Sequence, residues 1–151
     1  TFYLNNKNMA LAEKYLKIAS DKGDDFGTYE LGKLYRAQNK YDLAIKYYKI
    51  ASDRGYTEAT YGLSVLYYVQ YKDFPNAEKY AKLSIEQGSL SGISFLGTLY
   101  DEQGNTKLAE KYWIQAADKG EQTSMINLIT LYEETNKPKL KEKYEKMLNK
   151  K

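Results

Sequence analysis

The chain has 151 residues, of which 42% are hydrophobic and 28% charged, a composition typical of a folded globular protein. Because histidine and cysteine are both absent, the sequence excludes His-dependent triads, cysteine nucleophiles, disulfides and the usual zinc ligand sets. The net charge of +3 is uneven, since residues 137–151 hold seven lysines against two glutamates and the remainder is slightly acidic. No apolar run approaches the roughly 18 residues that a membrane span needs, so we expect no membrane partner.

Four similar segments follow one another along the chain at a nearly constant spacing. Each has the form A-x-x-Y-x-x-x-A/S-x-x-x-G, with small and aromatic residues at the helical spacing i, i+3, i+4, i+7. The closing glycine stands where a helix C-cap needs a left-handed residue. The segments are Ala12–Gly23, Ala44–Gly55, Ala77–Gly88 and Ala109–Gly120, at intervals of 32, 33 and 32 residues.

A second motif, L-x-x-L-Y, begins eight residues after each of these glycines. Its leucines and tyrosine also share one helical stripe. The four copies are Leu31–Tyr35, Leu63–Tyr67, Leu96–Tyr100 and Leu128–Tyr132. Pro75 and Pro138 suit the first turn of the helix that follows. The sequence therefore predicts helix-turn-helix units of 32–33 residues, which must stack because one helix pair cannot bury its apolar stripe alone.

The combination of L-G-x-L-Y with A-x-x-Y-x-x-A-A-x-x-G resembles the tetratricopeptide-like helical repeat superfamily, and it is most similar to the Sel-one-like repeat (SLR) proteins. The resemblance implies an all-α fold, a right-handed α-α superhelix (solenoid) of about four repeats plus a partial first repeat, in a single domain over residues 1–151. Two features depart from the SLR pattern. Its loop insertion rich in glycine and valine is missing, and so are the paired cysteines of some bacterial members.

The two ends of the array differ from its middle. Residues 1–5 align with the tail of a first helix, so we expect an N-terminally truncated array whose exposed stacking face can drive dimerisation. Residues 138–151 are expected to form a basic C-terminal capping helix with a polar outer face. Its lysines offer an alternative interpretation, attraction to nucleic acid or to an anionic membrane.

Two patterns that suggest chemistry have simpler explanations. Residues Gly27–Leu34 read GTYELGKL, close to a phosphate-binding loop, but leucine replaces the required hydroxyl and Gly32 occupies a repeat position. Adjacent acids on a helix point about 100° apart and do not share a proton or a metal. The acidic pairs are Asp24/Asp25, which suit helix N-capping, Asp101/Glu102 and Glu133/Glu134. We expect no catalytic residue, cofactor or metal.

Tyrosine is over-used, with 17 copies. Ten of them occupy two repeat positions and are expected to pack, as is Trp113 at the position of Tyr48. The ten are Tyr3, Tyr15, Tyr35, Tyr47, Tyr67, Tyr80, Tyr100, Tyr112, Tyr132 and Tyr144. The other seven are Tyr29, Tyr41, Tyr48, Tyr56, Tyr61, Tyr68 and Tyr71, of which Tyr48 is also expected to be core. All seven lie between residues 29 and 71, a local excess that indicates a binding surface on a uniform scaffold.

Three positions of each first helix lie opposite its packing stripe, at −2, +2 and +5 from the first leucine of L-x-x-L-Y. In the superfamily that stripe lines the concave groove, so the resemblance makes these residues candidate partner contacts. They are Tyr29, Lys33, Arg36, Tyr61, Val65, Tyr68, Ser94, Thr98, Asp101, Ile126, Thr130 and Glu133. Such a groove is aromatic and basic at its N-terminal end and acidic at its C-terminal end, which suits an extended segment. The alternative is an ordinary exposed helix face whose tyrosines only cover the backbone.

The sequence thus predicts a non-catalytic scaffold or adaptor that binds a protein or peptide. An inhibitory or immunity-type protein that masks a folded partner is the alternative within binding modules. A β-lactam-related enzyme is a further alternative through the SLR resemblance, against which stand the missing His, Cys and S-x-x-K. Nucleic-acid binding requires basic groove positions in every unit, whereas Asp101 and Glu133 occupy two of them.

Overall fold

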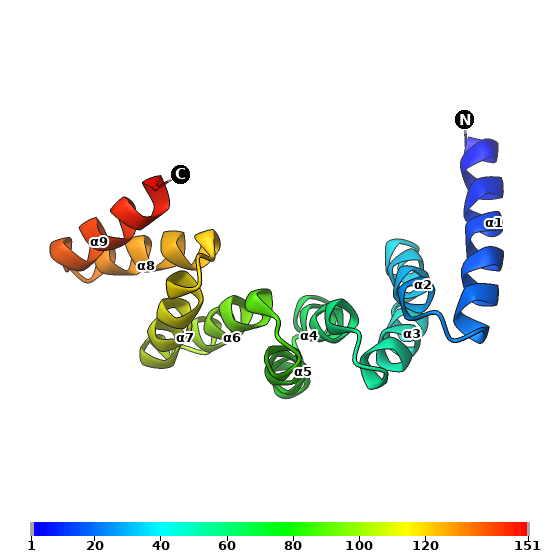
Figure 1. Cartoon of the computed structure of the whole chain (residues 1–151), viewed down its shortest axis with the longest axis horizontal. Coiled ribbons are helices and arrows are strands. Elements are labelled where there is room, and N and C mark those ends of the chain that lie inside the picture. The colour runs from blue at the N-terminus through cyan, green and yellow to red at the C-terminus, as the bar shows by residue number, and fades with distance from the viewer. Residues whose placement is uncertain (1, 151) are drawn as a thin grey trace. The chain divides into compact units, whose positions relative to one another are not determined.

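The computed structural model describes residues 2–150, and it describes the side chains of residues 5–150 (Figure 1). Within that range nine helices joined by short turns account for the chain, and no strand is present. The helices are α1 Phe2–Asp21, α2 Asp25–Ala37, α3 Tyr41–Asp53, α4 Thr57–Tyr71, α5 Phe74–Glu86, α6 Leu90–Glu102, α7 Thr106–Asp118, α8 Gln122–Glu134 and α9 Pro138–Asn149. The predicted all-α class is confirmed.

The helices form two compact units, which we call unit 1 (Thr1–Asp73, α1–α4) and unit 2 (Phe74–Lys151, α5–α9). Within each unit every helix packs on the next one along the chain, from α1 to α4 and from α5 to α9. Packing between sequence neighbours is the arrangement that a repeat architecture requires, because each helix pair needs the next to cover its apolar stripe. A single domain over residues 1–151 stays a prediction.

The turns after the A-x-x-Y helices form as predicted. Gly23, Gly55, Gly88 and Gly120 have φ values of 85°, 87°, 95° and 91°. In the first of them the Gly23 amide donates to the carbonyl of Ser20 at 2.9 Å, and the Asp24 amide donates to that of Ala19 at 3.0 Å. The same two bonds recur at the other three glycines. These paired bonds make a Schellman cap, for which glycine is the residue with the lowest conformational cost.

A second set of left-handed residues ends the L-x-x-L-Y helices, and our sequence analysis did not predict it. The set is Asn39, Lys72, Gly104 and Asn136, with φ values of 59°, 51°, 78° and 52°. The sequence signal is an asparagine or glycine eight residues before the tyrosine of the next A-x-x-Y segment or its equivalent, in three of the four copies. Lys72 breaks that rule, and a Cβ in this conformation costs about 1–2 kcal/mol.

The segment that resembles a phosphate-binding loop is helical. Residues Gly27–Leu34 lie inside α2, so their amides are engaged along the helix and form no cradle. Asp24 is the N-cap of this helix, and its carboxylate accepts a hydrogen bond from the Gly27 amide at 3.2 Å. The neighbouring Asp25 lies 3.4 Å from the Arg54 guanidinium. Capping therefore accounts for Asp24, as the sequence predicts.

The N-terminal helix differs from the predicted partial first repeat. Residues aligned with the tail of a first helix continue without a turn into the A-x-x-Y segment, as one helix of 20 residues. The position that adopts the left-handed conformation in the later repeats is Lys7 here, and no glycine or proline interrupts residues 2–21. An uninterrupted helix gains one backbone hydrogen bond for each residue added, so it extends where no tertiary partner imposes a turn.

One face of α1 is consequently open. Tyr15 was expected to pack, but it is 64% exposed, and Leu11 and Ile18 are 43% and 42% exposed. The corresponding tyrosines stack on the tyrosine of their own first helix, in the pairs Tyr47–Tyr35 (5.5 Å between ring centroids), Tyr112–Tyr100 (5.6 Å) and Tyr144–Tyr132 (5.9 Å). The prediction is wrong for Tyr15 because no separate first helix covers it. The side chain of Tyr3 lies outside the described residues.

A tyrosine–glutamate hydrogen bond joins each first helix to the helix before it in three repeats. The phenols of Tyr35, Tyr100 and Tyr132 donate to Glu13, Glu78 and Glu110, each over 2.8 Å and 22 residues apart. Burial, and then the carboxylate partner, raises the pKa of all three phenols. Tyr67 is the exception, since the residue 22 places earlier is Ile45. In the sequence, the segments that form this hydrogen bond read A-E-K-Y, whereas the segment before Tyr67 reads A-I-K-Y.

The last helix, α9, packs against the core of unit 2. Its Tyr144 is buried, and Met147 and Leu148 pack beside it on a cluster that contains Trp113 and Tyr132. On its outer side, Lys141 pairs with Glu133 at 3.1 Å, and Lys146 pairs with Glu142 at 2.9 Å. An amphipathic helix therefore occupies the predicted region from residue 138. Its role as the end of the array stays a prediction.

Candidate functional site

An aromatic cluster lies beneath the predicted contact stripe of unit 1. Tyr48 is 1% exposed, and its ring edge lies so close to Gly32 that a Cβ on that glycine would stand 2.5 Å from Tyr48 Cδ1. Tyr29 stacks on Tyr48 with 5.8 Å between ring centroids, and it makes a tilted contact with Tyr56 at 5.2 Å between centroids. Tyr48 is thus core, and the half-buried Tyr29 and Tyr56 extend that core toward the surface.

Two cations of α2 border this cluster. The Lys33 ammonium lies 2.9 Å from Glu30 and 5.3 Å from the centroid of the Tyr29 ring, and the Glu30 carboxylate raises the pKa of Lys33. Arg36 is exposed, and its guanidinium interacts with the Tyr48 hydroxyl. Burial nevertheless raises the pKa of Tyr48, against the effect of Arg36. Exposed pairs of this kind contribute at most about 1 kcal/mol, so both cations can exchange their present contacts for a partner's.

A hollow of about 280 Å³, which we call the arginine pocket, opens between α2 and α4 in unit 1. Its apolar wall comes from Val65, Leu66 and Val69 of α4, while Arg36 supplies a cationic group from α2. The remaining lining residues are Ala37, Asn39, Tyr41 and Gln70. An apolar wall beside a guanidinium suits an acidic side chain with an aliphatic neighbour.

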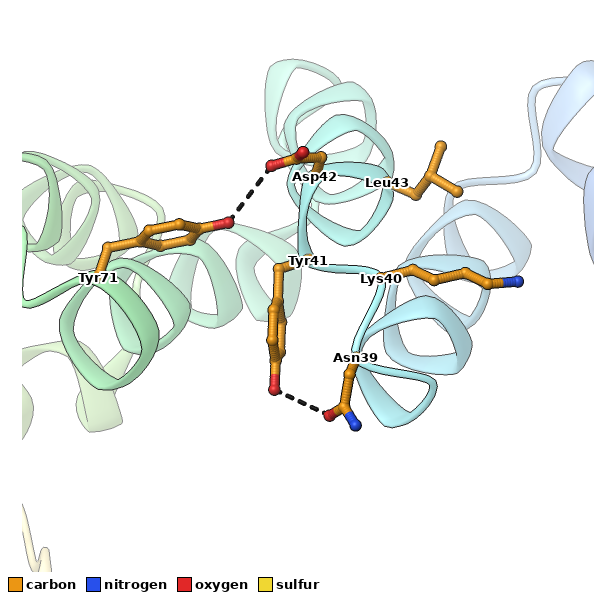
Figure 2. A pocket seen from close by; sticks show the side chains of 6 residues that line it. All are labelled: Asn39, Lys40, Tyr41, Asp42, Leu43 and Tyr71. Carbon is orange, nitrogen blue, oxygen red and sulfur yellow. Dashed lines mark hydrogen bonds between the residues drawn. The ribbon is translucent and has the colours of Figure 1, made fainter.

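A second hollow of about 330 Å³ adjoins it at the turn between α2 and α3 (Figure 2). Tyr41 and Asn39 line both hollows. The Tyr41 hydroxyl donates to the Asn39 side chain at 2.8 Å, and the Tyr71 hydroxyl donates to Asp42 at 3.3 Å. Figure 2 shows Lys40 extending away from both phenols. Both phenol hydroxyls are hydrogen-bonded within the chain, so this hollow mainly presents phenol rings.

In unit 2 a hollow of about 220 Å³, the tryptophan pocket, lies among α6, α7 and α8. Thr98 and Asp101 come from α6, and Trp113 comes from α7. The α8 residues that line it are Asn127, Thr130, Leu131 and Glu134. Asp101 and Glu134 are exposed, and neither belongs to an ion pair within residues 5–150. Two unpaired carboxylates therefore border a pocket whose other side chains are mostly polar.

Trp113 closes the base of this pocket, and only 5% of it is exposed. Its indole packs on Gly97, where a Cβ would stand 2.6 Å from Cδ1 and 2.7 Å from Nε1. The buried Nε1–H has no hydrogen-bond acceptor in the described part of the chain. A buried donor without an acceptor is uncommon in folded proteins and calls for a physical explanation.

The predicted contact residues divide into three groups in the structure. Arg36 and Val65 line the arginine pocket, and Thr98, Asp101 and Thr130 line the tryptophan pocket. Tyr29, Lys33, Tyr61, Tyr68 and Ile126 lie elsewhere on their helices, with Ile126 51% exposed and the Lys72 ammonium 4.2 Å from the Tyr68 ring centroid. Ser94 and Glu133 face other contacts, since Ser94 is buried against Ser124 and Glu133 pairs with Lys141.

The analysis of the sequence missed Val69 and Glu134, which line the two pockets. Both stand at position +6, four residues after a predicted contact at +2, and residues four apart share a helix face. The +6 position was therefore recoverable from helical geometry. Trp113 was recognised only as packing, because nothing in a sequence shows that its N–H lacks an acceptor.

Within residues 2–150 the structure shows no group of three or more acidic side chains that could hold a metal ion. No helix in that same range is long and apolar enough to cross a membrane.

Comparisons with known proteins show what this architecture is similar to. A family model described as tetratricopeptide repeat matches residues 29–91. The crystal structure of c5321, a protective antigen of uropathogenic Escherichia coli strains that displays an SLR fold, is 21% identical with a TM-score of 0.68, over 78% of this chain and 28% of that one. A Sel1 repeat protein from Oxalobacter formigenes is 22% identical with a TM-score of 0.71, over 83% of this chain and 54% of its own. No curated protein matches the sequence.

Proposed function

We propose that the chain is a non-catalytic scaffold that binds a protein or peptide segment on the open faces of its first helices, because residues 29–91 match a tetratricopeptide repeat model and the fold is similar to that of SLR proteins. Repeat proteins of this kind typically serve as interaction scaffolds. The chain spans only 28% and 54% of the two similar structures, so the proposal concerns this array of helices.

The arginine pocket is the observation that carries the proposal. Tyrosine and arginine are among the residue types that most often dominate binding energy at protein interfaces, and both line the arginine pocket. Val65 and Val69 supply apolar contact area, and the Arg36 guanidinium offers a planar, bidentate donor for a carboxylate. We therefore propose that unit 1 binds a segment in which an acidic residue stands beside an aliphatic one.

The chemistry of the carboxylates supports a non-catalytic role. A general acid at neutral pH needs a carboxyl group whose pKa is raised. Instead, the hydrogen bond from Tyr35 lowers the pKa of Glu13, and the Lys82 ammonium and the Tyr100 phenol lower that of Glu78. Both carboxylates serve the packing of one repeat on the next.

Exposed apolar residues away from the first-helix faces favour a second candidate, an inhibitory protein that masks a folded partner. Leu11, Tyr15 and Ile18 of α1 are exposed, and Phe26 at the start of α2 is 57% exposed. A folded partner would cover such residues together with the pockets, whereas a peptide would cover the pockets alone. The same face of α1 is the one through which we propose that two copies can associate.

Selection from a phage-displayed random peptide library on the immobilised chain tests the proposal. We expect enrichment of peptides with an acidic residue beside an aliphatic one, and an affinity at least tenfold weaker for Arg36→Glu. Arg54→Glu is the matched control, because Arg54 is also exposed and its closest acidic partner is Asp25, outside the pocket. Equal binding by the wild type and by Arg36→Glu would contradict the proposed pocket, and contacts mapped onto Leu11 and Phe26 would favour the folded partner.

A further inference from the structure

The two pockets occupy the same place in the repeat but have opposite chemistry. Alignment of the L-x-x-L-Y motifs pairs Arg36 of α2 with Asp101 of α6. On the facing helices α4 and α8, the same alignment pairs Val65 with Thr130 and Val69 with Glu134. Leu66 and Leu131 are equivalent and are retained in both linings. One repeat position thus carries a cation and apolar residues in unit 1, and two carboxylates with hydroxyl groups in unit 2.

The two carboxylates of the tryptophan pocket have no cation of their own. Lysine or arginine does not occur among the residues described as lining it. Glu133, the neighbour of Glu134 in the sequence, is by contrast engaged with Lys141 at 3.1 Å. Two negative charges at the rim of one concave site raise the local concentration of cations and repel anionic ligands.

The indole N–H supplies a second, independent indication of a ligand. A buried donor that lacks an acceptor carries a free-energy penalty, which is recovered when an acceptor arrives. In unit 1 the equivalent ring belongs to Tyr48, which carries no indole N–H, and its hydroxyl is not among the buried polar atoms without a partner. At Trp113 the acceptor must come from elsewhere. The N–H is buried where the indole packs on Gly97, so a backbone carbonyl of a bound segment reaches it only when the indole moves off that glycine.

We propose that the tryptophan pocket binds an arginine or lysine side chain of the partner segment. Asp101 and Glu134 hold the cationic group, and the Trp113 N–H donates to a carbonyl of the same segment. This inference rests on the proposed function, because it names the chemistry of one part of that partner. A bound divalent metal ion fits less well, since Ca²⁺ takes six to eight oxygen ligands and only two carboxylates are present.

Trp113 is the only tryptophan in the chain, so its indole N–H resonance reports on this pocket alone. The probes are the capped tripeptide acetyl-Gly-Arg-Gly-amide, its lysine counterpart, and two controls with citrulline or glutamate at the central position. All four are titrated into the whole chain at one ionic strength. We expect saturable shifts of the indole resonance with the two cationic probes, and binding at least tenfold weaker with citrulline, which keeps the shape of arginine but not its charge.

The acidic pairs of the sequence provide matched variants. Asp101→Asn and Glu134→Gln are each expected to weaken binding of the arginine probe about tenfold. Glu102→Gln removes the same charge from an exposed neighbour outside the lining, and it is expected to change the affinity less than twofold. Circular dichroism of each variant checks that the helices are intact. Equal binding of arginine and citrulline, an equal effect of all three variants, or no response at Trp113 would each overturn the inference.

The test separates this inference from the proposed function. The tripeptides are read at Trp113 in unit 2, whereas the library selection is judged by Arg36 in unit 1. Selected peptides that need Arg36, together with a silent Trp113 resonance, would overturn the cation site and leave the scaffold proposal standing. A charge-dependent response at Trp113 with no peptide selected by the arginine pocket would support the cation site and overturn the proposed site in unit 1.

Discussion

Replacing Tyr132 with phenylalanine tests whether the tyrosine–glutamate bond stabilises the stack of repeats. Tyr132 is 1% exposed, and its hydroxyl donates to Glu110 over 2.8 Å. A hydrogen bond to a charged group contributes about 1.5–3 kcal/mol. Water can rehydrate the half-buried Glu110 after the change, which recovers part of that loss. We therefore expect Tyr132→Phe to lower the free energy of unfolding by about 1–2 kcal/mol, with the ring stack on Tyr144 retained.

Urea denaturation followed by Trp113 fluorescence is the appropriate assay, because Trp113 and Tyr132 belong to one core cluster. Tyr112→Phe is the control, since its ring stacks on Tyr100 but its hydroxyl donates to no group within the described side chains. We expect this control to change stability by less than about 0.5 kcal/mol. Combining Tyr132→Phe with Glu110→Gln should give less than the sum of the single effects. Equal losses for the two tyrosines, or strictly additive effects, would refute the structural role of the bond.

Four further predictions concern the turns, the pH dependence and the open helix face. Gly55→Val should destabilise the chain by about 2 kcal/mol in urea denaturation, because a branched residue is strained at a φ of 87°. Lys72→Gly should stabilise it by up to about 1 kcal/mol, through relief of the left-handed lysine. Glu78, whose pKa is lowered in the fold, contributes stability that is present above pH 4–5 and lost as the pH falls, so Glu78→Gln should approach the wild type in stability toward pH 3. Tyr15→Lys with Ile18→Lys should abolish any dimer measured by light scattering, and an unchanged mass for a dimeric wild type would contradict the role of this face.

The fold was predictable because the same physical demand recurs at each repeat. The four glycine caps were recognised from spacing alone, since only a left-handed position explains a glycine in every copy. The uninterrupted course of helix α1 was not predictable in the same way. Alignment with a complete repeat implies a turn near Lys7, but such a turn forms only where neighbouring helices impose it. The exposure of Tyr15 follows from that missing neighbour, which is a property of tertiary context and not of the residue.

The helix face that carries the candidate site was predictable from the sequence, but the complete set of residues that line the pockets was not. Helical geometry identified Arg36, Asp101 and Thr130, which line pockets in the structure. It also selected Glu133, whose pairing with Lys141 depends on how α9 packs. The half-buried stacking of Tyr29 on Tyr48 was likewise invisible, because an angle around a helix gives no information on what the adjacent helix brings.

Packing positions and pocket-lining positions in each repeat are under different physical constraints. Gly32 and Gly97 are both held by the aromatic ring that packs on them, so neither can accept a side chain without moving a core residue. The exposed pocket-lining position occupied by Arg36 carries no such constraint, and the equivalent residue in unit 2 is Asp101. We propose that this charge reversal at an exposed position reflects what binds there. On that proposal the pockets, and not the packing motif that recurs in each repeat, determine the partner.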